Sequence, residues 1–207
     1  MGTAISVHVR GDADLDPVFD WLRWVDATFS TYREDSAISR GDHSDPRVRE
    51  VLDRCEALRR ETGGHFDGDP MGFVKGWAVE RAAALIDREC YVNAGGDVRV
   101  KGRWRVGVQH PLERNRVAAV IAVRDAAVAT SGAYERGEHI RGARGGVLSV
   151  TVVGPDLGTA DAYATAAYAM GAHGPDWTAT LGGYEAMTIL TDRTILETPG
   201  FADLRSP

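Results

Sequence analysis

Cysteine is scarce in this sequence. The 207 residues include only two cysteines, Cys55 and Cys90, which stand alone and match no metal-binding or redox spacing. The sequence therefore gives no sign of a cysteine-based metal or redox site. We expect both side chains to be buried thiols with a structural role, as suits a reducing compartment.

The chain also lacks an excess of positive charge and any long hydrophobic run. Its net charge is −6 and its pI is near 5.5, so no electrostatic footprint for nucleic acid or an anionic membrane is visible. No apolar run approaches membrane-spanning length, and the N-terminus enters an alternating strand pattern without the apolar core of a signal peptide. We expect a cytoplasmic protein without nucleic-acid partners or membrane insertion.

Internal repeats, low-complexity segments and long linkers are missing as well. With 43% hydrophobic and 26% charged residues, the length fits one domain spanning residues 1–207. The G-x-G-x-x-G spacing of dinucleotide-binding folds and the G-x-x-x-x-G-K spacing of a P-loop are absent from the glycine-rich stretches. Any nucleotide site in this chain must therefore use neither of these two glycine-rich motifs.

Strand and helix patterns alternate irregularly along the chain and predict an α+β fold. Strands are expected at 1–10, 91–102 with an interruption at Gly95-Gly96-Asp97, 104–111, 117–132 and 149–153, with a terminal hairpin turning at Asp192-Arg193. Helices are expected at 16–29, from 45 to the stop at Gly63-Gly64, at 77–86, and from Thr159 onwards.

The stretch from Ser149 to Gly171 carries the most specific chemistry. Thr159 is expected to cap a helix on which Asp161 and Thr165, four residues apart, face the same way. One carboxylate and one hydroxyl on the same helix face could be the ligands that the protein contributes to a magnesium ion. Taken alone, the pair is explained as well by a helix-dipole contact of Asp161 and a backbone hydrogen bond of Thr165.

Four other segments are candidates for ligand contact. Lys75-Gly76 is expected at a loop-to-helix junction, where backbone donors and the ammonium suit a pyrophosphate, although a solvated lysine is equally ordinary there. Gly95-Gly96 inside a strand indicates a bulge or the close approach of a ligand, and Thr130-Ser131-Gly132 at a strand end can line a pocket. Tyr32, in a polar loop, either stacks on a flat ligand or packs on a helix end.

Taken together, ordered pieces of the chain resemble the FAD:protein FMN transferases, the ApbE family. The pieces are MGT at the start, FSTYREDSAIS, TGGHFD, VKGWAVERAA, VNAGGDVRVKG, ATSG, HI, SVTVVGP and ADAYAT, and they cover nearly the whole chain. The resemblance implies an α+β, T-fold-related architecture of mixed and antiparallel sheets flanked by helices, with a flavin cleft between them.

The resemblance also implies an activity and a set of site residues. FAD would be cleaved in a magnesium-dependent reaction, FMN would be joined through a phosphoester to a threonine or serine of a target protein, and AMP would leave. Asp161, Thr165 and a backbone oxygen at Gly72 would hold the metal, and His139 and Asp161 would be catalytic. The flavin nucleotide would contact Met1, Tyr32, Phe66, Asp67, Asp69, Lys75, Gly95, Gly96, Asp97, Thr130, Ser131 and Gly132.

One departure from the family pattern leaves alternatives open. His139-Ile140 is followed by Arg141-Gly142 instead of the family's D-P-x-T-G-like segment. An FAD pyrophosphatase that gives FMN and AMP, or a non-catalytic FAD-binding protein, therefore stand beside the transferase. The Thr130-Ser131-Gly132 segment superficially resembles a flavin acceptor, but Val128 and Tyr134 flank it unsuitably. We expect transfer to a separate protein and none to Ser131.

Overall fold

The computed structural model describes residues 3–113, 115–132 and 145–206. The strands are β1 (Ile5–Val9), β2 (Cys90–Ala94), β3 (Asp97–Lys101), β4 (Arg103–Gln109), β5 (Val117–Arg124), β6 (Ala127–Gly132), β7 (Val147–Gly154), β8 (Glu185–Leu190) and β9 (Ile195–Glu197). The helices are α1 (Asp16–Phe29), α2 (Ala37–Arg40), α3 (Pro46–Glu61), α4 (Met71–Ala84), α6 (Leu157–Met170), the 3-10 turn η2 (Gly171–His173), α7 (Gly174–Thr178) and α8 (Pro199–Leu204).

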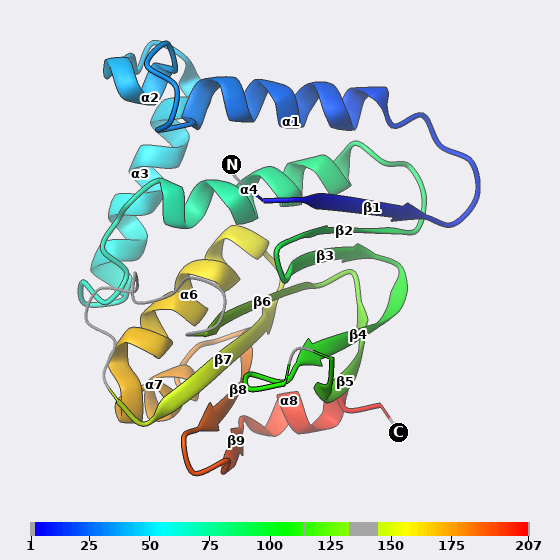
Figure 1. Ribbon diagram of the computed structural model, residues 1–207, viewed down its shortest axis with the longest axis vertical. Coiled ribbons are helices and arrows are strands. Elements are labelled where there is room, and N and C mark those ends of the chain that lie inside the picture. Colours follow the sequence, from blue (N-terminus) through cyan, green and yellow to red (C-terminus); the bar gives the residue numbers. More distant parts are fainter. Residues whose placement is uncertain (1–2, 114, 133–144, 207) are drawn as a thin grey trace.

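The described strands form one seven-stranded sheet and one two-stranded ribbon (Figure 1). The order in the main sheet is β1-β2-β3-β6-β7-β8-β9, and each neighbouring pair is antiparallel. The ribbon pairs β4 with β5, which leave the sheet after β3 and return to it at β6. The predicted α+β class and the terminal β8–β9 hairpin are confirmed.

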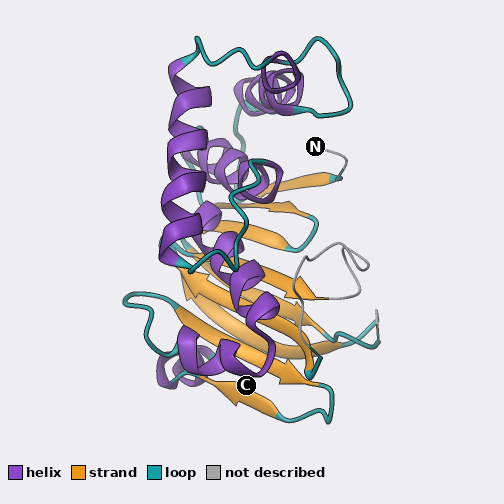
Figure 2. Ribbon diagram, turned by 90° about the vertical axis from the view of Figure 1, so that its left-hand side faces the viewer, coloured by secondary structure: helices purple, strands orange, loops and turns teal. Residues whose placement is uncertain are grey.

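The two faces of the main sheet are covered by different layers. Helices α4 and α6 pack against one face, α1 and α3 pack on α4, and together these four helices form the larger hydrophobic core with the sheet. Figure 2 shows helices in front of and beside the strands. On the other face, β4, β5 and Phe201 of α8 enclose a smaller core. The side chains of β6 and of the central part of β7 are therefore buried on both faces of the sheet.

Helix α4 begins earlier than the glycine-rich sequence suggests. It starts at Met71, not near Trp77, so Gly72 and Gly76 lie within it. A Cβ placed on Gly76 would lie 2.8 Å from both the Cα of Gly158 and the carbonyl oxygen of Leu157. Tight packing against α6 thus offsets the weak helix propensity of glycine, and the prediction of a loop-to-helix junction at Lys75 is wrong.

Two turns also differ from expectation. Gly95 and Gly96 have φ of +57° and +92° and join β2 to β3 as a two-residue hairpin. Of the two interpretations of these glycines, the bulge inside one strand is wrong, and the close approach of a ligand stays a prediction. The predicted strand over 117–132 is broken at Asp125, whose φ is +49° and whose side chain accepts a hydrogen bond from the Gly102 N–H at 2.7 Å. Strands β5 and β6 consequently belong to different sheets.

The start of α6 is capped by a residue other than the predicted one. The Asp156 carboxylate accepts a hydrogen bond from the Thr159 N–H at 2.7 Å, so Asp156 and not Thr159 is the N-cap. The cap moves Asp161 from the first turn of the helix into the second.

Cys55 and Cys90 are buried free thiols, as expected. Across the described residues, no helix is both long enough and apolar enough to cross a membrane.

Candidate active site

Three charged side chains meet in the interior between α4, β3 and α6. The Lys75 Nζ lies 2.5 Å from Oδ2 of Asp97 and 3.9 Å from Oδ2 of Asp161. Both aspartates are fully buried, and the lysine side chain is only 17% exposed. We call Lys75, Asp97 and Asp161 the charge cluster.

The charge cluster exists because two helix backbones touch. Gly76 of α4 lies directly against Gly158 of α6, and neither position leaves room for a side chain. The contact brings Lys75, one residue before Gly76, next to Asp161, three residues after Gly158. Asp97 reaches the same point because the β2–β3 hairpin turn places it at the start of β3.

The electrostatics of the cluster favour binding of a further cation. Burial raises the pKa of Asp97 well above its ordinary value, and the neighbouring Asp161 carboxylate raises it further, while Lys75 opposes both effects. With both carboxylates ionised, the cluster carries one net negative charge. A divalent cation bound there would reverse that sign and make the site attractive to a pyrophosphate.

Two hydroxyl groups lie close to the cluster on the same face of the sheet. Ser131 Oγ and Thr165 Oγ1 are 3.1 Å apart, and Thr165 follows Asp161 by one helical turn. Thr130, which was predicted to line the same pocket, faces the other core and pairs with Thr151 Oγ1 at 3.0 Å. Alternation along β6 points Thr130 and Ser131 to opposite faces of the sheet, and the contact of Thr130 with the flavin nucleotide stays a prediction.

The donors present fit a hard cation such as Mg²⁺. Apart from the Lys75 ammonium, no described N–H or O–H group donates to the buried carboxylate of Asp97, which keeps lone pairs for a metal ion. Asp161 and Thr165 supply the carboxylate and hydroxyl oxygens that magnesium prefers. No cluster of three or more His, Cys, Asp or Glu side chains suited to a metal occurs in the described part of the chain. Hydroxyls, backbone, water and substrate would therefore complete the shell.

A second ion pair ties the same three elements together. Arg99 of β3 lies 2.6 Å from Oε1 of Glu80 in α4, and Oε2 of Glu80 accepts a hydrogen bond at 3.0 Å from the Leu157 N–H at the start of α6. Sequence reasoning missed this arrangement. The one sequence feature that could have predicted it is the spacing of Asp97 and Arg99, which are two residues apart and therefore share one face of their strand.

A cavity of about 460 Å³ lies between β1 and α1. Thr3, Phe19 and Arg33 are among its lining residues. A Cβ on Gly95 would lie 2.8 Å from Oγ1 of Thr3, so the cavity adjoins the hairpin that carries Asp97. Its volume falls within the range of cofactor pockets.

The remaining predicted contacts stay predictions, although the structure places several of them. Tyr32 is 89% exposed, whereas Phe66 is buried with its ring against Gly72 in the first turn of α4. Asp67 and Asp69 accept hydrogen bonds from the N–H groups of Asp69 and Met71, which shapes the turn before α4. Met1 and His139 lie outside the described residues, and Gly132, the last residue of β6, is buried beside Ser131.

Comparisons with known proteins agree with the architecture. The ApbE family model matches residues 1–68 and 69–188. The FAD:protein FMN transferase of Vibrio cholerae is 32% identical over 128 residues, 50% of this chain and 38% of that protein. The Escherichia coli K12 protein of the same name is 28% identical over 122 residues, 47% of this chain and 35% of that protein. The matched segments thus span well under half the length of these relatives.

Solved structures extend the likeness over the whole fold. The ApbE protein of Thermotoga maritima superposes with a TM-score of 0.84 at 22% identity, covering 100% of this chain and 97% of that one. The flavin transferase ApbE of Vibrio cholerae also gives 0.84 at 22% identity, covering 99% and 96%. Because the family model matches most of its length, the chain belongs to the ApbE family.

Proposed function

We propose that this protein is a magnesium-dependent FMN transferase that uses FAD as donor and a threonine or serine of a separate protein as acceptor. The observation that carries the proposal is the charge cluster, in which two fully buried carboxylates and one ammonium meet beside a pair of hydroxyls. Such a site suits the positioning and charge neutralisation that phosphoryl transfer requires. The names of the matched relatives support the same reaction.

Each element of the cluster has a role in this reaction. Asp161 and Thr165 would hold the metal ion, which supplies charge neutralisation at the pyrophosphate when bound. Lys75 would contact a pyrophosphate oxygen, and Asp97 orients the lysine ammonium through their ion pair. The cavity between β1 and α1 would take one ring system of FAD. Its lining residue Thr3 touches the hairpin that leads to Asp97.

The chemical step is a substitution at phosphorus. The acceptor hydroxyl oxygen bonds to the phosphorus on the FMN side, the bond from that phosphorus to the bridging oxygen breaks, and AMP leaves with that oxygen. The hydroxyl proton passes to a base, and His139 is the residue predicted to be that base. Backbone contact between α4 and α6 keeps the charged groups in place throughout.

The proposal is tested by incubating the purified protein with FAD, MgCl₂ and a candidate acceptor peptide containing threonine or serine. AMP is measured by chromatography, and the peptide by mass spectrometry. A transferase gives equal amounts of AMP and FMN-bearing peptide. AMP and free FMN with every acceptor tested would identify an FAD pyrophosphatase instead, and FAD binding without cleavage would identify a binding protein.

A further inference from the structure

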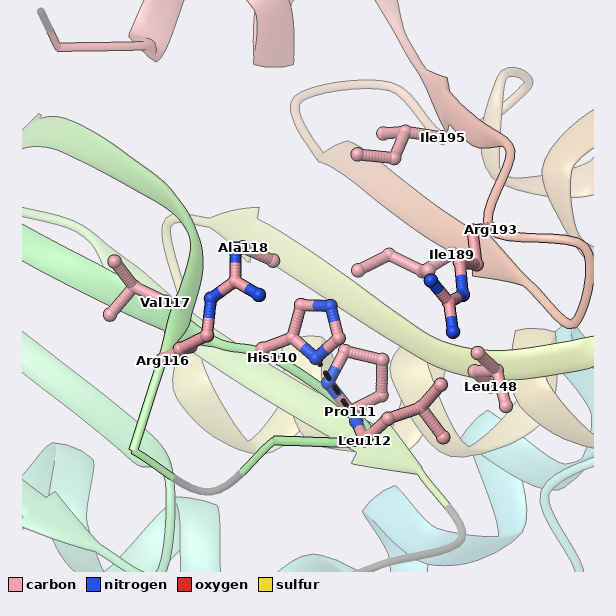
Figure 3. A pocket seen from close by; sticks show the side chains of 10 residues that line it. All are labelled: His110, Pro111, Leu112, Arg116, Val117, Ala118, Leu148, Ile189, Arg193 and Ile195. Atoms are coloured by element: carbon pink, nitrogen blue, oxygen red, sulfur yellow. Dashed lines mark hydrogen bonds between the residues drawn. The ribbon is translucent and has the colours of Figure 1, made fainter.

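A small pocket lies on the face of the sheet opposite the charge cluster. The connection between β4 and β5, the start of β7 and the turn between β8 and β9 enclose it (Figure 3). Leu148 and Ile189, at its floor, belong to the smaller core or pack against it. We call this site the turn pocket, and nothing in the proposed reaction uses it.

The lining of the turn pocket combines apolar and cationic side chains. Three of its apolar residues rank among the most exposed large hydrophobic side chains in the described chain, with exposed fractions of 54%, 57% and 43%: Leu112, Val117 and Ile195. Three basic side chains stand around them: His110, Arg116 and Arg193. Glu113 pairs with Arg116 and lies 3.9 Å from Nε2 of His110, so the positive charge of the rim rests mainly on Arg193.

Arg193 is held over the pocket at a conformational cost. Its φ is +70°, in the left-handed region that favours glycine, asparagine or aspartate. The turn itself is satisfied by Asp192, whose side chain accepts a hydrogen bond from the Thr194 N–H at 2.9 Å, so nothing local requires arginine. The left-handed conformation itself is usual for the last residue of a three-residue hairpin loop, whereas arginine is an uncommon residue at that position.

The guanidinium of Arg193 is also available to a ligand. Figure 3 shows it extending from the turn into the space between Ile189 and Leu148, facing His110. Arg116 pairs with Glu113 at 2.8 Å, whereas Arg193 forms no salt bridge with any residue in the described part of the chain. Arg116 is the main cause that lowers the pKa of Glu113, and the more distant Arg193 lowers it further. An anionic group in the pocket would meet this guanidinium directly.

The size of the pocket indicates what it accepts. Its volume is about 150 Å³, well below the several hundred Å³ that cofactor-sized ligands occupy, and comparable with one large aliphatic side chain. Pockets that receive one anchoring side chain are typical of the centres of protein interfaces. A carboxylate next to the anchor would pair with Arg193, so charge complementarity favours an acidic partner over a basic one.

We propose that the turn pocket docks a polypeptide segment of another protein in which an aliphatic side chain is flanked by an acidic one. The aliphatic group fills the space among Leu112, Val117 and Ile195, and the carboxylate pairs with Arg193. The proposal is independent of the flavin chemistry, because the charge cluster lies on the other face of the sheet.

The test uses a fluorescein-labelled, C-terminally amidated decapeptide of serine and glycine with a central Leu-Glu pair, and a matched Leu-Gln peptide. Fluorescence anisotropy is measured with the wild-type protein and with Arg193→Gly. Glycine relieves the left-handed strain, so this variant should be at least as stable as wild type in thermal unfolding. Arg124→Gln, on an exposed arginine at the end of β5, is the matched control.

We expect the Leu-Glu peptide to bind wild type and the control variant equally, and Arg193→Gly about tenfold or more weakly, the range of a charge-assisted hydrogen bond. The Leu-Gln peptide should bind the wild-type protein more weakly than the Leu-Glu peptide by a similar factor. Added salt should lower the affinity of the Leu-Glu peptide only. Equal binding of both peptides, undiminished binding to Arg193→Gly, or no binding to wild type would overturn the proposal. So would sedimentation showing a wild-type dimer that Arg193→Gly abolishes, because the pocket would then join two copies of this chain.

Discussion

Replacing Lys75 by methionine tests the charge cluster most sharply through stability. Methionine keeps much of the side-chain length and removes the ammonium from between two fully buried carboxylates. Removing one partner of a buried ion pair typically costs about 3–5 kcal/mol, because the remaining charge is left uncompensated. In a domain of this length about 1 kcal/mol corresponds to roughly 2–4 °C in Tm, so Tm at neutral pH should fall by about 6–20 °C.

The loss should depend on pH in a defined direction. Burial and Asp161 already raise the pKa of Asp97 in the folded state, and removing Lys75 raises that pKa further. A carboxyl whose folded pKa lies above its unfolded value, near 3.9, binds its proton more tightly when folded. The stability that Lys75→Met loses relative to wild type is therefore small below the pKa of Asp97 in the unfolded state. The loss grows as pH rises from that value to the pKa of Asp97 in the folded state.

The assay is thermal unfolding of wild type and Lys75→Met from pH 4 to pH 8, with and without MgCl₂. Magnesium should restore part of the lost stability, since a ligand at a hundred times its Kd adds about 2.7 kcal/mol. Arg81→Met is the control, because Arg81 lies on the same helix in an exposed pair with Glu50, where about 0–1 kcal/mol is expected. A loss that is equal at all pH values and unaffected by magnesium would refute the reasoning.

Four further predictions follow from the site. Asp161→Asn should abolish metal-dependent FAD cleavage while leaving circular dichroism unchanged, and AMP release at the wild-type rate would contradict its role as metal ligand. Gly76→Ala should destabilise the protein by about 1–3 kcal/mol in urea, because its Cβ would collide with α6, whereas Gly182→Ala, with open space around it, should not; equal effects would argue against the backbone contact. Glu80→Gln should raise the magnesium concentration needed for half-maximal cleavage several-fold with little change in FAD affinity, and a general loss of FAD binding would assign Glu80 a different role. Ser131 should carry no FMN after incubation with FAD and magnesium, because the residue is 1% exposed and its hydroxyl is hydrogen-bonded to that of Thr165. Flavin found on the tryptic peptide that contains Ser131 would overturn this prediction.

The parts of the site that were predictable from sequence are those set by local periodicity. Asp161 and Thr165 share a face because they are one helical turn apart, whatever residue caps the helix. The opposite orientations of Thr130 and Ser131 follow equally from strand alternation, and that rule should have separated the two hydroxyls in advance.

The long-range parts could not be derived in the same way. Gly72 and Gly76 favour a loop by their intrinsic propensity. Gly76 is suited to the helix because the backbone of α6, some eighty residues later, packs against it, whereas Gly72 packs against the ring of Phe66. The ion pairs Lys75–Asp97 and Arg99–Glu80 depend on the packing of α4 against β3, which is likewise a long-range contact. The family resemblance identified Lys75 and Asp97 as site residues, but not that they bind one another.

The central claim is that the charge cluster holds a divalent cation against the pyrophosphate of FAD. Its most direct test is a crystal structure of the protein with FAD and Mn²⁺, a magnesium substitute located by its anomalous scattering. The account predicts a manganese peak bonded to a carboxylate oxygen of Asp161, with a pyrophosphate oxygen in the same coordination shell and the Lys75 ammonium beside it. FAD bound with its pyrophosphate away from Asp161, or manganese bound elsewhere on the protein, would contradict it.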